Sequence, residues 1–350
     1  MRTFSATVAI LVLLVGHAAG SPLELATING AQLPEKSASD KQASEAGISP
    51  HLIKAQILLD RVRFSPGEID GKPGTNLDKA IAAFAAAKGL QTPAGLNQQV
   101  WKALTATSQD SVVKEYTISD EDRRGPFADN IPSNLEAMKD LPVLAYTGLR
   151  EQLAEKFHMS EALLTALNPG RKFETSGETI LVANITTSTQ PGKTVRVEVD
   201  KSAQTLKAFD RDGILLAFYP ATAGSVEKPA PDGRLKVTVV TRNPTYRYNP
   251  DYAFKGVRSR KPFNIKPGPN NPVGVVWIGL SSGDGYGIHG TPEPSKISKT
   301  ESHGCIRLTN WDALALASSL AKGTPVDFTG NEQDARNARA QATVTKKKRR

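Results

Sequence analysis

Two neighbouring stretches, Tyr286-Gly287-Ile288-His289-Gly290-Thr291 and Ser302-His303-Gly304-Cys305-Ile306-Arg307-Leu308, hold the most reactive side chains of this 350-residue chain. They contain its only cysteine and two of its five histidines. A thiol attacks a carbonyl as the thiolate, and its unperturbed pKa of about 8.5 makes it depend on a neighbouring base or cation. His289 precedes Cys305 by 16 positions, enough for one strand to carry the histidine and for the chain to return beside it. The spacing therefore predicts a nucleophile and its base.

The glycine before the cysteine fits the same chemistry. Gly304 allows a close approach of the backbone just before Cys305. The amides of residues 303–305 are then expected to point at one developing oxyanion.

These motifs resemble the catalytic signature of L,D-transpeptidases, the cysteine enzymes of bacterial peptidoglycan. The resemblance covers about residues 193–329 and includes Gly268-Pro269-Asn270-Asn271-Pro272-Val273-Gly274 and Gly323-Thr324-Pro325-Val326. It implies that Cys305 forms a thioester with the third residue of a peptidoglycan stem peptide, and that D-alanine leaves. His289 would act as base and acid, with the carbonyl of Gly290 as its orienting group and with no cofactor.

Further residues of the two stretches are expected in the same site. His303 and Gly304 would shape it around the nucleophile. Arg307 would recognise a carboxylate or brace the loop, and Ser302 and Tyr286 would contribute to substrate binding.

Three alternatives to crosslinking are considered. Water as the acceptor would make the protein an L,D-carboxypeptidase or a hydrolase that trims crosslinks with the same residues. A non-catalytic wall-binding protein could keep the enzyme fold as a scaffold, although the presence of both Cys305 and His289 argues against it. Metal hydrolysis is set aside because the sequence has no His-x-x-x-His or Cys-x-x-Cys spacing.

The first twenty residues predict export. Arg2 precedes an apolar run over residues 6–15, and Ala18-Ala19-Gly20 suits cleavage before Ser21. Residues 1–20 are thus expected to be a signal peptide, with an uncleaved N-terminal anchor as the alternative. Export to the periplasm or cell wall would follow, without stable membrane insertion after cleavage.

The formal net charge of +9 is consistent with a partner rich in carboxylates, such as cell-wall peptides. Nucleic acid is not expected, because lysines and arginines are scattered and export removes the opportunity. The dense cluster at 346–350 follows a polar stretch from Gly330, so residues 330–350 are predicted to be a basic disordered tail. It is either solvated or bound to a wall or membrane surface. The sequence does not indicate the oligomeric state.

Two small modules are predicted before the catalytic domain. Residues 21–47 are expected to be a linker, and 48–106 form three amphipathic helices that resemble the three-helix peptidoglycan-binding module. A second linker, 107–140, with one short strand, leads to residues 141–184, which resemble a LysM module that binds peptidoglycan glycan. Both modules either tether the enzyme to the wall or only space it. His158 is expected to be an ordinary polar residue between two helices.

Residues 193–329 alternate with a period of two and predict a mostly antiparallel β domain. The chain is therefore expected to be a multidomain α+β protein. One helix is predicted over 311–321, with Asn310 as its N-cap. The longest irregular stretch, 242–272, is predicted to form a substrate-covering flap or to pack over a sheet edge.

Overall fold

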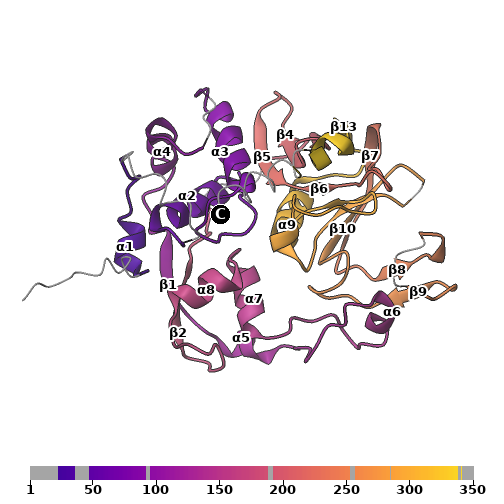
Figure 1. Cartoon of the computed structure of the whole chain (residues 1–350), viewed down its shortest axis with the longest axis horizontal. Coiled ribbons are helices and arrows are strands. Elements are labelled where there is room, and N and C mark those ends of the chain that lie inside the picture. Colours follow the sequence, from indigo (N-terminus) through magenta and orange to yellow (C-terminus); the bar gives the residue numbers. More distant parts are fainter. Residues whose placement is uncertain are drawn as a thin grey trace, which may run out of the picture.

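The structure is a computed structural model that describes residues 23–35, 47–91, 95–187, 192–252, 257–283, 285–337 and 340. A helix-rich N-terminal half lies beside a β-rich C-terminal half, with helix α9 (Asn310–Ser319) at their border (Figure 1). The predicted signal peptide and the basic cluster at 346–350 lie outside the described residues. Within those residues no helix is long and apolar enough to cross a membrane.

The three helices predicted over 48–106 are confirmed, and a fourth precedes them. The helices are α1 (Leu25–Asn29), α2 (Pro50–Arg61), α3 (Thr75–Ala87) and α4 (Gln98–Thr105). Helix α1 corrects the expectation that residues 21–47 are only a linker, because Ile28 is fully buried in the core. The Asn29 side chain also bonds the backbone of Val113 in both directions, at 2.9 and 3.0 Å. Five residues are too few to show a helical period in the sequence.

The segment predicted to be a LysM-like module gains a strand from the preceding linker. Strand β1 (Val113–Thr117) is the short strand expected within 107–140, and it pairs antiparallel with β2 (Thr179–Ala183). Between them come α5 (Asp120–Arg124), α6 (Leu135–Met138), α7 (Leu149–Lys156) and α8 (Glu161–Leu167). Because the paired residues are 62 to 70 positions apart in the sequence, only the fold reveals that the two strands belong together.

One hydrophobic core serves both modules. It extends from Ile28 through the helices of the first module to Val182 and Ala183 of β2, and it includes Phe218 of the C-terminal half. The two modules expected to be separate are therefore packed as one body.

The β-rich half contains a nine-stranded sheet with the order β5-β4-β3-β13-β7-β10-β11-β12-β6. Its strands are β3 (Arg196–Asp200), β4 (Thr205–Phe209), β5 (Leu215–Pro220), β6 (Thr222–Ala223), β7 (Gly233–Arg242), β10 (Val276–Leu280), β11 (Gly287–His289), β12 (Ile306–Arg307) and β13 (Pro325–Thr329). Pairing is mostly antiparallel, as predicted, with parallel contacts between β13 and β3 and between β11 and β12. In β3 the alternating Val197 and Val199 are fully buried.

The stretch 242–272 is more regular than predicted. Strands β8 (Tyr246–Tyr248) and β9 (Phe263–Ile265) form a separate two-stranded sheet, and a 3-10 turn η1 spans Pro250–Tyr252. A second such turn, η2, spans Pro294–Lys296. Helix α6 lies against β9, so a part of the expected linker covers this small sheet (Figure 1).

Helix α9 starts one residue earlier than predicted and has a different cap. Thr309 is the N-cap, and its hydroxyl accepts from the Asp312 amide at 3.1 Å. The side chain of Asn310, predicted as the cap, is buried at the border between the two halves. The cap assignment was wrong because Thr309 and Asn310 are both good capping residues.

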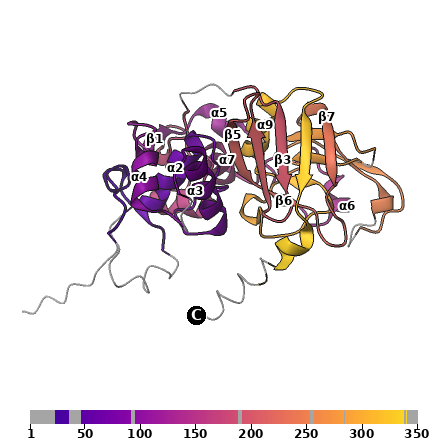
Figure 2. The same cartoon turned by 90° about the horizontal axis from the view of Figure 1, so that it is seen from above.

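The predicted disordered tail is ordered at its start. Residues 332–337 are helical, and Glu332 and Ala335 are buried against the catalytic half. In the view of Figure 2 this end of the described chain lies below the large sheet.

Candidate active site

Strand register brings the predicted catalytic side chains together. Strands β11 and β12 are parallel neighbours, with His289 opposite Arg307. Cys305 directly precedes β12, and alternation along the strand puts it on the same face as Arg307. All three residues line one cavity of about 610 Å³. Its other walls include Trp277, Tyr286, His303, Lys228, Leu135, Tyr246, Arg247 and Val273.

His289 is buried and held by two contacts. Its Nδ1 lies 2.6 Å from the carbonyl oxygen of Gly290, the orienting group expected from the sequence. The ring stacks on Trp277, its partner across β10 and β11, with 5.6 Å between centroids. Since a carbonyl only accepts, this contact assigns the proton to Nδ1 and leaves Nε2 as the free base.

Burial keeps the imidazole neutral. Burial and, to a smaller extent, the positive charge of Arg307 lower the pKa of His289 to about 3, although the hydrogen bond to Gly290 opposes the shift. An imidazole that is neutral throughout the physiological range can accept a proton from a thiol.

Cys305 is also neutral at rest. Burial raises the pKa of its thiol, while a backbone hydrogen bond with Gly287 and the charge of Arg307 oppose the shift. Among the described residues, no hydrogen bond joins its sulfur to His289. The resting pair is therefore a thiol and an imidazole, and the thiol depends on its neighbouring base for activation.

The turn before the nucleophile depends on Gly304. Its φ is +102°, and a Cβ there would lie 2.5 Å from a ring carbon of Tyr286. The Ser302 hydroxyl donates to the carbonyl of Cys305 at 2.6 Å and is absent from the cavity lining. Ser302 thus fixes the turn, whereas the sequence suggested that it binds substrate.

The remaining predicted residues face the cavity. The pKa of His303 is lowered by burial and by the charges of Arg307 and Lys228, so its ring is neutral near pH 7. The Arg307 guanidinium donates to the Glu301 carbonyl at 3.4 Å. It both braces the loop and leaves positive charge beside the thiol.

Comparison with known proteins shows the family of this chain. Residues 194–328 match the family described as the L,D-transpeptidase catalytic domain. The YkuD protein of Bacillus licheniformis is 31% identical over 182 residues, which span 51% of this chain and 92% of that protein. This chain belongs to the L,D-transpeptidase family. YkuD of Bacillus subtilis is 28% identical over 175 residues, which cover 50% of the chain and 89% of that relative. Among solved structures, L,D-transpeptidase 3 from Mycobacterium tuberculosis with a faropenem-derived adduct is 20% identical, with a TM-score of 0.32; the match covers 43% of this chain and 67% of that chain.

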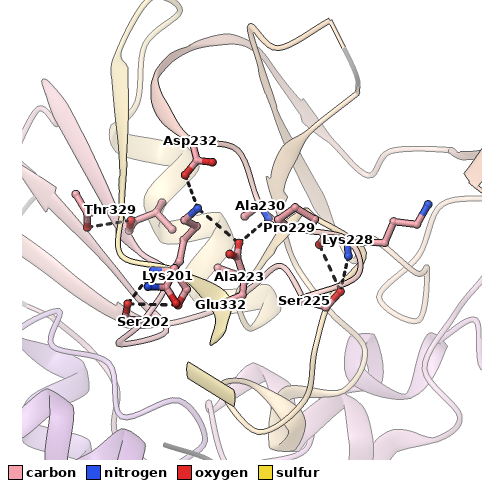
Figure 3. Close-up of polar contacts among 12 residues, drawn as sticks. Lys201, Ser202, Ala223, Ser225, Lys228, Pro229, Ala230, Asp232, Thr329 and Glu332 are labelled. Carbon is pink, nitrogen blue, oxygen red and sulfur yellow. Dashed lines mark hydrogen bonds and ion pairs between the residues drawn. The ribbon is translucent and has the colours of Figure 1, made fainter. Parts of the chain in front are cut away.

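Glu332, at the start of the C-terminal helix, contacts the loop 225–232, which carries one residue of the L,D-transpeptidase cavity (Figure 3). Glu332 accepts from the Ala230 amide at 2.8 Å and lies 3.7 Å from the buried Lys201 ammonium. Lys201 also pairs with Asp232 at 2.6 Å. The braced loop includes Lys228, which lines the cavity. Glu332 escaped the sequence analysis because it lies in the stretch predicted to be disordered.

Two other walls of this L,D-transpeptidase cavity come from outside the two motifs. Tyr246 and Arg247 belong to β8, so the stretch 242–272 lines the cavity, in agreement with the first of its two predicted roles. Leu135 belongs to the predicted linker and was not expected in the cavity. Within the described residues, no cluster of three or more His, Cys, Asp or Glu is arranged to hold a metal ion.

Proposed function

We propose that this L,D-transpeptidase crosslinks peptidoglycan stem peptides between third-position residues through a thioester on Cys305. The observation that carries the proposal is the register that puts Cys305, His289 and Arg307 on one face of the sheet, in one cavity. The family supplies the reaction class, acyl transfer on stem peptides.

In the first half-reaction the Cys305 proton passes to Nε2 of His289 as the sulfur attacks the carbonyl carbon before D-alanine. Because both groups are neutral at rest, attack and proton transfer accompany each other once the substrate displaces water from the cavity. Backbone amides of the Gly304 turn would stabilise the oxyanion. The C–N bond then breaks, His289 protonates the leaving amine, and a thioester remains.

In the second half-reaction an amine of another stem replaces D-alanine. His289 accepts a proton from this amine, whose nitrogen attacks the thioester, and the released sulfur is reprotonated. Arg307, Lys228 and Arg247 surround the cavity with positive charge, which suits the carboxylates of stem peptides.

The acceptor is tested by product analysis. Purified enzyme is incubated with muropeptides that carry tetrapeptide stems, beside a Cys305→Ala control. A dimer joined between two third-position residues, absent from the control, supports the proposal. Tripeptide alone, even with abundant acceptor, would make the protein an L,D-carboxypeptidase, and cleavage of existing dimers would make it a trimming hydrolase.

We further propose that the protein is exported and that its N-terminal half binds the wall. The leader-like residues 1–20 support export. A cavity of about 380 Å³ in the LysM-like module supports glycan binding, and its lining includes Glu115, Asn168 and Arg171. Arg171→Ala is expected to reduce co-sedimentation of the full chain with insoluble peptidoglycan, whereas Arg150→Ala, at an exposed ion pair outside this cavity, should not. Equal sedimentation of both variants would favour a spacer role.

A further inference from the structure

The side chain of Asn310 lies where three backbone segments of the catalytic half meet. It is 1% exposed. Its Oδ1 accepts from the Val275 amide at 3.2 Å, and its Nδ2 donates to the Pro269 carbonyl at 3.2 Å. The amide therefore joins the start of α9 to the loop that precedes β10.

Asn310 also packs directly against the residue that orients the catalytic histidine. A Cβ added to Gly290 would lie 2.2 Å from Asn310 Oδ1, so only glycine fits beside this amide. The Gly290 amide donates to the Val276 carbonyl at 3.3 Å. The Gly290 peptide is thus confined between Asn310 and β10, and its carbonyl faces His289 Nδ1 at 2.6 Å.

The other side of Asn310 is held by the N-terminal half. Both oxygens of Glu155, in α7, accept from Asn310 Nδ2, at 3.0 and 3.1 Å. Glu155 also accepts from the Tyr146 hydroxyl at 2.9 Å. The Val275 amide can only donate and the Pro269 carbonyl can only accept, so Oδ1 faces Val275 and Nδ2 faces Glu155. Burial raises the pKa of Glu155 to about 7, and its hydrogen bonds from Asn310 and Tyr146 oppose the shift. Residues 155 positions apart in the sequence thereby share one network.

We propose that Glu155 is a positioning residue for catalysis: through Asn310 it holds the Gly290 carbonyl that keeps the His289 proton on Nδ1. The LysM-like module then completes the active site of the catalytic domain. This inference rests on the proposed role of His289 as the base.

The test compares two variants of the full chain that match Glu155 in shape. Glu155→Gln keeps a carbonyl acceptor for Asn310, whereas Glu155→Met fills the same volume without one. The rate of Cys305 alkylation by iodoacetamide should stay within about twofold of wild type for Gln and fall about tenfold for Met. Glu161→Gln is the control: Glu161 and Glu155 line one cavity between the two halves, but Glu161 does not contact Asn310, so this variant should match wild type.

Nitrogen NMR of His289 adds a readout that loss of stability alone does not change. Wild type and Glu155→Gln should show the proton on Nδ1, and Glu155→Met should show a mixture of tautomers. A double variant, Glu155→Met with Asn310→Ala, should be alkylated no more slowly than Asn310→Ala alone, because Glu155 acts on the Gly290 carbonyl only through Asn310.

Wild-type alkylation and a single Nδ1–H tautomer in Glu155→Met would overturn the inference, as would additive losses in the double variant. The variant His289→Ala separates the positioning role of Glu155 from the proposed role of His289 as the base. If that variant is slow while Glu155→Met is not, only the positioning role fails. If His289→Ala itself alkylates normally, the proposed function fails with it.

Discussion

Phe64 and Phe218 join the two halves of the molecule backbone to backbone. The Ser65 amide donates to the Phe218 carbonyl at 2.9 Å, and the Phe218 amide donates to the Arg63 carbonyl at 2.8 Å. The Phe218 ring, 2% exposed, is part of the N-terminal core although it belongs to β5 of the catalytic sheet. The hydrophobic core of the N-terminal half therefore extends across the border into the catalytic sheet.

Further side-chain contacts cross the same border. His158 lies 3.0 Å from Asp60 within the N-terminal half, and its ring stacks on Trp311 of α9 across the border, with 5.1 Å between centroids. The Ser65 hydroxyl donates to Asp312 at 2.8 Å. His158 thus joins the two halves, which its sequence context did not suggest.

A chain that begins at Thr187 is expected to be less stable than the full chain and to react more slowly. The truncation exposes Phe218, removes His158 from the ring of Trp311, and removes Glu155 from Asn310. Thermal unfolding should show a melting temperature lower by several degrees, because burying one large aromatic side chain contributes about 1.5–3 kcal/mol. An unchanged melting temperature with unchanged acylation by a soluble probe would show that the border contacts are dispensable.

Alkylation of Cys305 in the free enzyme is expected to rise steadily with pH. Burial raises the pKa of the thiol and keeps His289 neutral above pH 4, so no thiolate–imidazolium plateau should occur between pH 5 and 8. At pH 7 His289→Ala should slow acylation by a carbapenem by an order of magnitude or more, and His51→Ala, distant on α2, should not. A plateau in the wild-type alkylation profile beginning near pH 6 would instead indicate a preformed ion pair.

Glu332→Ala should loosen the rim of the cavity. It leaves the Ala230 amide without its acceptor and removes one carboxylate from the buried Lys201, at a cost of about 1–3 kcal/mol in the free energy of unfolding. Denaturant titration measures this loss, and KM for the stem peptide should rise more than kcat falls. Asp334→Ala, exposed on the same helix, is the matched control. Equal stability and equal KM for the two variants would contradict the role of Glu332 in stabilising the loop at the cavity rim.

Glu68 lines a cavity between the two halves, together with Glu155 and Trp311, and makes the free energy of unfolding depend on pH. Burial raises its pKa from 4.5 to about 7, Lys299 opposes the shift, and Asp70 and Glu161 add to it. The folded protein binds the Glu68 proton more tightly than the unfolded chain does, so the free energy of unfolding falls as the pH increases from about 4.5 to 7. Glu68→Gln should therefore be more stable than wild type at pH 8, by about 1–3 kcal/mol, and equal to it at pH 4. The exposed Glu174→Gln should show no such difference, and a parallel pH dependence for wild type and Glu68→Gln would contradict the assignment.

The sequence predicted the parts that depend on local pattern. The period of two gave the strands around Val197 and Val199, and helical spacing gave α2, α3 and α4. The His289 and Cys305 motifs predicted two residues that line one cavity, because a cysteine and a histidine in this pattern are typical of a nucleophile and its base. These features need only neighbours within about twenty positions.

The features that were missed depend on contacts between distant residues. Strand β1 acquires its partner from β2, Asn310 meets Glu155, and Glu332 meets Ala230 across 102 positions. Each of these residues looks like an ordinary surface or linker residue in its local context. Likewise, burial raises the pKa of the Cys305 thiol, and the local sequence pattern does not predict how deeply this residue is buried.

Intact-mass measurement of the acyl-enzyme tests the central claim most directly. After incubation with a carbapenem, the full chain should gain the mass of one adduct, and peptide mapping should locate it on Cys305. Cys305→Ala should gain none, and His289→Ala should gain it at least tenfold more slowly. An equal adduct on Cys305→Ala would contradict the assignment of Cys305 as the nucleophile.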